Sequence, residues 1–125
     1  MIKASVLSLN AVIVLAFSIL NCVYAQQTKA TLHLRPIQQN GKWGYIDSTG
    51  KIVIKPQFVS AEEFSEGLAA IENEDGKHGY IDESGVVVIE PRFDNLTDFS
   101  EGLAAVSVKF EWGYIDRTGK WAIPP

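Results

Sequence analysis

The feature that most constrains this chain is an internal repeat with a period of 34 to 35 residues. The stretch FSEGLAAI, which begins at Phe64, returns as FSEGLAAV at Phe99. The same period separates three further sets of landmarks, which are Gly44, Gly79 and Gly113; Gly50, Gly85 and Gly119; and Pro56, Pro91 and Pro125. Repeats of this length are supersecondary units that bury their apolar faces against their neighbours. The fold should therefore be built from copies of one unit.

Each copy of the repeat has the composition of antiparallel strands joined by a tight turn. The segments KWGYID, KHGYID and EWGYID alternate their side chains with a period of two, as strands do. They lead into the turns DSTG, DESG and DRTG, where Asp can bond to its own backbone and Gly can take a positive φ. The β-branched runs KIVI, VVVI and KWAI then follow as strands. We expect Pro56, Pro91 and Pro124 to end these strands, because proline has no N–H to donate to a sheet.

The links between the copies each carry two phenylalanines. One link, QFVSAEEFSEG, runs from Gln57 to Gly67, and the other, RFDNLTDFSEG, runs from Arg92 to Gly102. The phenylalanines should fold back over the strands as apolar plugs, whereas the acidic residues of the links should face water. The plugs are Phe58, Phe64, Phe93 and Phe99, and the acids are Glu62, Glu63 and Asp98.

The predicted fold class is all-β, with three tandem three-stranded antiparallel meanders. They form one repeat domain over residues 26–125, in units of about 28–66, 67–101 and 102–125. The first unit begins with a divergent strand within ATLHLRPIQQ. We expect an open array in preference to a closed trefoil-like or propeller-like arrangement. Because an open array leaves edge strands unpaired, self-association through these edges is a further expectation.

Residues 1–25 have the features of a secretory signal peptide. Lys3 precedes an apolar run over residues 4–20. The segment then ends in VYA, which resembles the small-residue cleavage site of a signal peptide. This composition predicts a secreted or periplasmic protein. An uncleaved membrane anchor is less favoured because the run is short for a span. A lipoprotein signal at Cys22 is less favoured because Asn21 stands where a small residue is needed.

The motifs resemble those of the WG-repeat family, also called KWG repeats. That family has a GxWGYID segment, a glycine turn, an apolar strand ending in proline, a phenylalanine, and a closing FSEGLA. The pattern is matched by Gly41 to Ala70, by Gly76 to Ala105 with His78 in the tryptophan position, and in shortened form by Glu111 to Pro125. The resemblance implies a bacterial β-repeat protein, often exported, with presumed binding roles and no established catalytic residues.

Six ring side chains are the candidate ligand-binding residues: Trp43, His78, Trp112, Tyr45, Tyr80 and Tyr114. The first three share one position of the repeat, and the tyrosines lie two residues further on, on the same strand face. In the structural interpretation these rings pack across the strand pair. In the functional one they form a row of aromatic faces for a sugar ring or a peptide, with His78 adding pH sensitivity. Trp121 replaces the aliphatic Ile52 and Val87, and we expect it to cap the apolar face left by the missing fourth link.

Other chemistry has little support in the sequence. With 11 Lys and Arg against 15 Asp and Glu, the chain has a net charge of −4, which argues against a nucleic-acid partner. The run ENEDGKHGYID has only part of a calcium-loop spacing, since Ile71 stands at the first ligand position. Two histidines without a cysteine after Cys22 make a zinc site improbable. No nucleophile elbow or phosphate loop occurs, and the adjacent Glu62 and Glu63 would point to opposite faces of a strand.

The function predicted from these features is that of a non-enzymatic exported repeat domain, without cofactor or metal, that binds another protein. The alternative is a glycan or cell-wall binding module that uses the aromatic rings named above.

Overall fold

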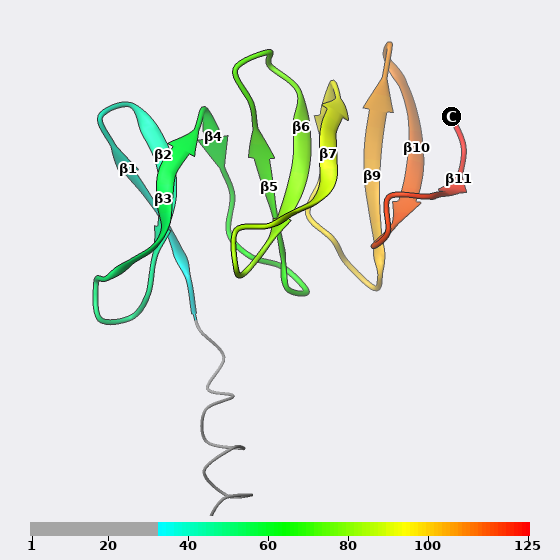
Figure 1. The fold of residues 1–125 in the computed structure, drawn as a ribbon. Helices are drawn as coiled ribbons and strands as arrows, with labels where there is room; N and C mark the ends of the chain where they lie inside the picture. Colours follow the sequence, from blue (N-terminus) through cyan, green and yellow to red (C-terminus); the bar gives the residue numbers. More distant parts are fainter. Residues whose placement is uncertain (1–32) are drawn as a thin grey trace, which may run out of the picture. The chain divides into compact units, whose positions relative to one another are not determined.

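The computed structural model describes residues 33–125, which form three antiparallel sheets in succession (Figure 1). The predicted signal peptide over residues 1–25 lies outside the described residues. The strands are β1 Arg35–Gln39, β2 Lys42–Ile46, β3 Ile52–Phe58, β4 Ser60–Ala61, β5 Leu68–Glu72, β6 His78–Asp82, β7 Val87–Phe93, β8 Asn95–Leu96, β9 Leu103–Val108, β10 Glu111–Asp116 and β11 Trp121–Ile123. None of the elements in this part of the chain is a helix long and apolar enough to cross a membrane.

Each sheet is a meander built around one copy of the repeat. The strand orders are β1-β2-β3 in the first sheet, β4-β5-β6-β7 in the second and β11-β10-β9-β8 in the third. The predicted all-β class, with tandem antiparallel meanders in an open arrangement, is confirmed. The two-residue strands β4 and β8 add to the prediction. Each lies in a link and pairs with the first long strand of the meander that the link leads into.

The turns from Asp to Gly form as the sequence predicts. In the first, the N–H of Gly50 donates to the carbonyl of Asp47 at 3.0 Å, and Gly50 has a φ of 85°. The Oδ1 atom of Asp47 accepts hydrogen bonds from the N–H groups of Thr49 and Lys51, at 2.8 and 3.1 Å. The turns of the other two meanders repeat these bonds. One aspartate in each meander therefore stabilises its turn through its own side chain.

The prediction that proline ends the second strand of each hairpin is wrong at two of its three positions. Strand β3 continues through Pro56 to Phe58, and β7 continues through Pro91 to Phe93. Strand β11 does end just before Pro124. Proline is tolerated inside β3 and β7 because the pairing of each strand shifts register there and forms a bulge. Residues in a bulge are left unpaired, so the absence of an N–H on proline breaks no sheet hydrogen bond.

The bulge in β3 explains the glycine of the repeated GYID segment. Tyr45 pairs with Ile54, but Trp43, two residues earlier, pairs with Phe58, so β3 has extra residues opposite Gly44. These residues fold over the glycine so closely that a Cβ there would lie 2.4 Å from the carbonyl oxygen of Ile54. The same position in the other two sheets is equally crowded, with backbone oxygen atoms at 2.4 and 2.6 Å. Only glycine leaves room for the crossing backbone.

The apolar core lies between successive sheets, in two clusters. The cluster between the first and second sheets consists of Leu34, Tyr45, Ile54, Phe58, Ala61, Ala69, Ile71 and Ile81, with Trp43 and Phe64 packed against it. The cluster between the second and third sheets consists of Leu68, Ala70, Tyr80, Ile89, Phe93, Phe99, Ala104, Val106 and Ile115. All four link phenylalanines belong to or border these clusters, which confirms the prediction that they act as apolar plugs.

Each sheet therefore has two distinct faces, because successive strand residues point to opposite sides. We call the side that packs on the preceding sheet the N-terminal face; in the second sheet it carries Ala69 and Ile81. The side that packs on the following sheet is the C-terminal face; in the second sheet it carries Leu68, Tyr80 and Ile89. The repeat places residues of the same kind on the corresponding faces of all three sheets.

Candidate functional site

The C-terminal face of the third sheet exposes residues whose counterparts in the second sheet are buried. Tyr80 and Ile89 of the second sheet are 0% and 3% exposed. At the same positions of the third sheet, Tyr114 is 45% exposed and Ile123 is 56% exposed. Leu103, on the same face, is exposed as well. The third sheet thus presents to solvent an apolar surface of the type that the other sheets bury.

In the first two sheets, the link that follows covers the tyrosine of this face. The ring of Phe64 lies 4.8 Å from that of Tyr45, whose hydroxyl donates a hydrogen bond of 2.7 Å to the carbonyl of Glu62. Tyr80 repeats the arrangement, with the ring of Phe99 at 4.7 Å and a bond of 2.6 Å to the carbonyl two residues before that phenylalanine. Burial raises the pKa of both hydroxyls, so each tyrosine is a neutral donor.

The two links also bond to one another through a serine and a glutamate. The hydroxyl of Ser65 donates to the carbonyl of the phenylalanine in the second link, at 2.8 Å. The carboxylate of Glu66 accepts a hydrogen bond of 3.0 Å from the N–H of Gly102. The counterparts of this serine and glutamate in the second link are Ser100 and Glu101, and both are exposed. They lie beside the exposed face, because Leu103 follows them directly in the chain.

The six ring side chains predicted as candidate ligand-binding residues are Trp43, Tyr45, His78, Tyr80, Trp112 and Tyr114. The structure buries the first two tyrosines completely and half-buries the residues in the tryptophan position of the first two sheets. Only Trp112, at 53%, and Tyr114, at 45%, are classed as exposed among the six. The predicted row of rings is therefore reduced to one exposed pair on the C-terminal face of the third sheet.

Trp121 does not cap this face, contrary to the prediction. Its ring meets that of Phe93 edge-on, with centroids 6.1 Å apart. Trp121 pairs with Ile115, a core residue of the N-terminal face, whereas Tyr114 points to the other side of the strand. The tryptophan therefore helps to seal the junction with the second sheet and leaves Tyr114 uncovered.

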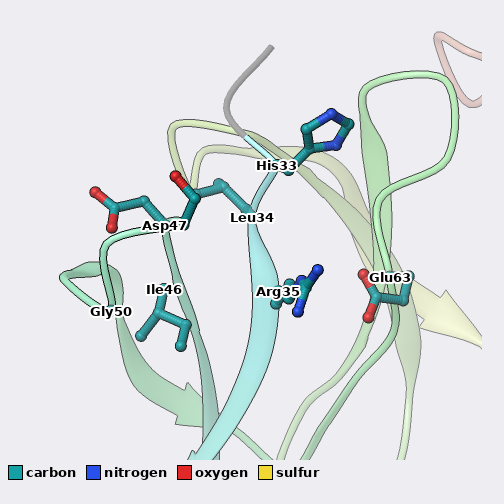
Figure 2. Close-up of a pocket in the computed structure, with 8 residues that line it drawn as sticks. His33, Leu34, Arg35, Ile46, Asp47, Gly50 and Glu63 are labelled. Carbon is teal, nitrogen blue, oxygen red and sulfur yellow. The ribbon is translucent and has the colours of Figure 1, made fainter. Parts of the chain in front are cut away.

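A hollow of about 570 Å³ lies at the end of the first sheet where β1 begins, beside the turn that follows β2 (Figure 2). It is lined by His33, Leu34, Arg35, Ile46, Asp47, Ser48, Gly50 and Glu63. Arg35 pairs with Ile46 as Ala69 pairs with Ile81 in the second sheet. The later sheets bury an alanine at this position, so the guanidinium makes the N-terminal face of the first sheet different in character.

A second hollow of about 350 Å³ lies between the two links and the second sheet. His78, Glu62 and Asp98 are among the residues that line it. Throughout residues 33–125, no three His, Cys, Asp or Glu side chains come together in a way that could hold a metal ion. In the run considered above as a partial calcium loop, the Oδ1 of Asn73 accepts bonds of 3.0 Å from the N–H groups of Asp75 and Lys77. That side chain is used by its own hairpin turn.

Comparison with protein families gives a match in each sheet. The family model described as WG containing repeat matches residues 43–77, 79–109 and 112–125. The chain belongs to the WG-repeat family. Comparison with curated proteins gives no match, and neither does comparison with solved structures.

The WG repeat in the sequence is offset by one strand from the sheet in the structure. The match over residues 43–77 contains most of β2 and all of β3, β4 and β5, so one WG repeat begins in the first sheet and ends in the second. The match over residues 79–109 bridges the second and third sheets in the same way. Each complete WG repeat thus supplies a C-terminal face together with the link that covers it, whereas the match over residues 112–125 contains only β11 and part of β10.

The sequence interpretation missed four residues of this site: Ser100, Glu101, Leu103 and Ile123. Their residue types are the ones that every WG repeat uses for structure, and each has a counterpart with a packing or bonding role. The only signal that distinguishes them is their place relative to the last FSEG segment.

Proposed function

We propose that this WG-repeat chain is a non-enzymatic exported domain that binds another protein through the C-terminal face of its third sheet. The observation that carries the proposal is the exposure of Tyr114 and Ile123 where the second sheet buries Tyr80 and Ile89. Contiguous exposed apolar side chains mark interaction surfaces, and aromatic residues are enriched in interface cores.

Export and a bacterial source are parts of the same proposal. The apolar run over residues 4–20, preceded by Lys3 and followed by VYA, supports a secretory signal. The WG-repeat family supports a bacterial origin.

A non-enzymatic role is supported by what the aspartates of the described chain do. Asp47, Asp82 and Asp116 each hold backbone N–H groups of their own turn. The hydroxyl of the turn threonine or serine donates to each of these carboxylates and lowers its pKa below the ordinary value. General acid-base catalysis near neutral pH needs the opposite shift. Alanine substitution of Glu62 and Asp98, in the second hollow, would reveal any catalysis there as a loss of activity.

Affinity capture from the cell-envelope fraction tests the protein-binding function. The bait is the full chain, beside a variant with Tyr114→Ser and Ile123→Ser and a control variant with Val86→Ser. Val86 is an exposed apolar residue of the second sheet's turn, so its loss removes apolar surface away from the proposed face. We expect one set of partners that the chain and the control retain and the face variant loses. Equal retention by all three would exclude this face as the binding surface.

A second candidate function is the binding of a cell-wall glycan. Trp112 and Tyr114 are both exposed and lie two residues apart in β10, so their rings are on one side of the strand. Sugars stack on such aromatic surfaces. Titration of tryptophan fluorescence with soluble cell-wall fragments is the test, and the absence of both a spectral change and retention on the insoluble polymer would eliminate this candidate.

A further inference from the structure

We propose that the partner presents a phenylalanine-containing segment of the kind found in this chain's own links, and that the C-terminal face of the third sheet binds it as the first two sheets bind theirs. This inference rests on the proposed function, since it specifies what the protein-binding face recognises. The partner segment would be extended, with one phenylalanine, a free carbonyl two residues before it and a glycine three residues after it.

The apolar part of this specificity follows from the two occupied copies of the site. Phe64 and Phe99 place their rings 4.8 and 4.7 Å from the tyrosine that they cover. Tilted or edge-on aromatic pairs at this separation are the favoured geometry. Tyr114 offers the same ring at the same repeat position, with Leu103 and Ile123 on the same face. A partner phenylalanine would complete the cluster that Phe99 completes one sheet earlier.

The polar part of the specificity fixes the direction of the bound segment. The tyrosine hydroxyl donates to the carbonyl two residues before the phenylalanine in both occupied sites. The serine hydroxyl of the preceding link donates to the carbonyl of the phenylalanine itself, and the glutamate accepts from the glycine N–H three residues later. The same three groups are exposed on the third sheet and the link before it: the hydroxyls of Tyr114 and Ser100 as donors and the carboxylate of Glu101 as an acceptor. Three directional bonds around one ring select a defined main-chain path.

A second copy of this chain does not provide the matching surface. Its two links already cover Tyr45 and Tyr80 of the same molecule. Its N-terminal face carries Arg35 where the packed faces of the later sheets carry the buried Ala69 and Ala104. Stacking on that face would place the long Arg35 side chain where both packed junctions hold a small buried alanine, so the close packing of those junctions could not form. The occupant is therefore a link-like segment of another polypeptide.

The test uses a synthetic peptide with the sequence of residues 92–105, RFDNLTDFSEGLAA, added to the full-length chain. Amide chemical shifts report binding residue by residue, and the tryptophan fluorescence, to which the exposed Trp112 contributes, gives a second signal. We expect shift changes centred on Ser100, Glu101 and Tyr114. A peptide with alanine in place of the second phenylalanine should bind about tenfold more weakly or worse, because it loses the aromatic pair and its buried area.

Protein variants separate recognition from folding. Tyr114→Phe keeps the ring and removes the hydroxyl, so it should weaken peptide binding by about threefold to tenfold, as expected for one hydrogen bond. Val86→Ser is the control and should leave the affinity unchanged. Both positions are exposed, so both variants should keep the wild-type spectrum in the absence of peptide.

Three results would overturn the inference. One is the absence of binding at millimolar peptide. Another is a set of shift changes around Tyr45 or Tyr80, which would mean that the peptide displaces a link of the chain itself. The third is self-association of the chain that Tyr114→Ser abolishes, which would make a second copy the occupant. If the peptide does not bind but capture of envelope partners still depends on Tyr114 and Ile123, the protein-binding function is supported and recognition of a link-like segment is excluded.

Discussion

The glycine that follows the tryptophan or histidine of each repeat supplies space for a neighbouring backbone. In the second sheet, a Cβ on Gly79 would lie 2.4 Å from the carbonyl oxygen of Ile89 and 2.7 Å from the nitrogen of Pro91. Its φ is not positive, so conformational freedom is not what the position requires. The glycine and the proline are thus two parts of one crossing, 12 residues apart in the sequence.

Gly79→Ala should therefore lower the free energy of unfolding by about 3 kcal/mol or more, because the atoms in the way are backbone atoms of a paired strand. Urea denaturation followed by circular dichroism measures the loss. Gly41→Asn is the control: Gly41 has a φ of 78° with open space around it, and asparagine suits that turn conformation. The control should cost less than about 1 kcal/mol. Equal stabilities of the two variants would refute the crowding argument.

The turn aspartates make stability depend on acid. Hydrogen bonds lower the pKa of Asp82 in the folded chain, so its carboxylate stabilises the fold fully above the ordinary aspartate pKa of about 3.9. That contribution is lost as the pH falls through the lowered folded pKa. Asn73 shows that an amide oxygen accepts the same pair of backbone bonds in a turn of this chain.

Asp82→Asn should therefore fold and should lose less stability on acidification below about pH 4 than the wild-type chain does. Thermal unfolding midpoints, measured from neutral to acidic pH, give the comparison. Glu83→Gln removes the neighbouring exposed carboxylate, which has no bond to the turn, and serves as the matched control. An acid dependence that is the same for Asp82→Asn and the wild type would count against this role of the turn carboxylate.

At the scale of elements, the sequence predicted where strands and turns occur, but it misplaced the ends of two strands, β3 and β7. The alternation in KWGYID and the Asp-to-Gly turns depend on local chemistry, so they could be read directly. The continuation of β3 and β7 past proline could not, because it depends on a glycine in the partner strand and on the register that brings the two together. The strands β4 and β8 are too short to have a period of their own and form only against the next meander.

The hairpin between β9 and β10 is strained at its tip. Lys109 and Phe110 have φ values of 51° and 70°, and the ring of Phe110 is 96% exposed. The hairpin between β1 and β2 uses the same conformation with Asn40 and Gly41, which suit it. A bulky residue with positive φ is unfavourable by about 1 kcal/mol or more.

Replacing Lys109→Asn and Phe110→Gly together should therefore raise the free energy of unfolding by about 1 kcal/mol. Chemical denaturation is again the measurement. The single variant Phe110→Ala keeps a side chain at positive φ and should change stability by less than about 0.5 kcal/mol, since the ring has no packing to lose. If the double variant is no more stable than Phe110→Ala, backbone strain is not present at this tip.

At the scale of the whole described chain, we expect the local stability of a sheet to increase with the number of its faces that pack against a neighbouring sheet. The second sheet contributes to both apolar clusters, whereas the first and third sheets each contribute to one. For the same reason the candidate site could not be predicted from its residues alone. Tyr80 and Tyr114 occupy the same repeat position, and only the link packed against the first of them makes one a core residue and the other an exposed one.

Native-state hydrogen exchange should follow this distribution. We expect the amides of β5 and β6 to exchange most slowly and those of β11, whose three residues are all exposed, to exchange fastest. Binding of the link peptide should slow exchange in β10 more than in β6, because it would cover the third sheet. Uniform exchange rates across the three sheets would instead indicate that the array opens only as a whole.

Arg35 has a consequence for how molecules of this protein behave at high concentration. A contact between the C-terminal face of one copy and the N-terminal face of the next would repeat without closing, and contacts of that kind generate filaments. An alanine at this position, as in the two later sheets, would give the molecule two complementary ends. The arginine makes the two ends unlike, so we expect it to disfavour this end-to-end association and to leave the exposed face of the third sheet accessible.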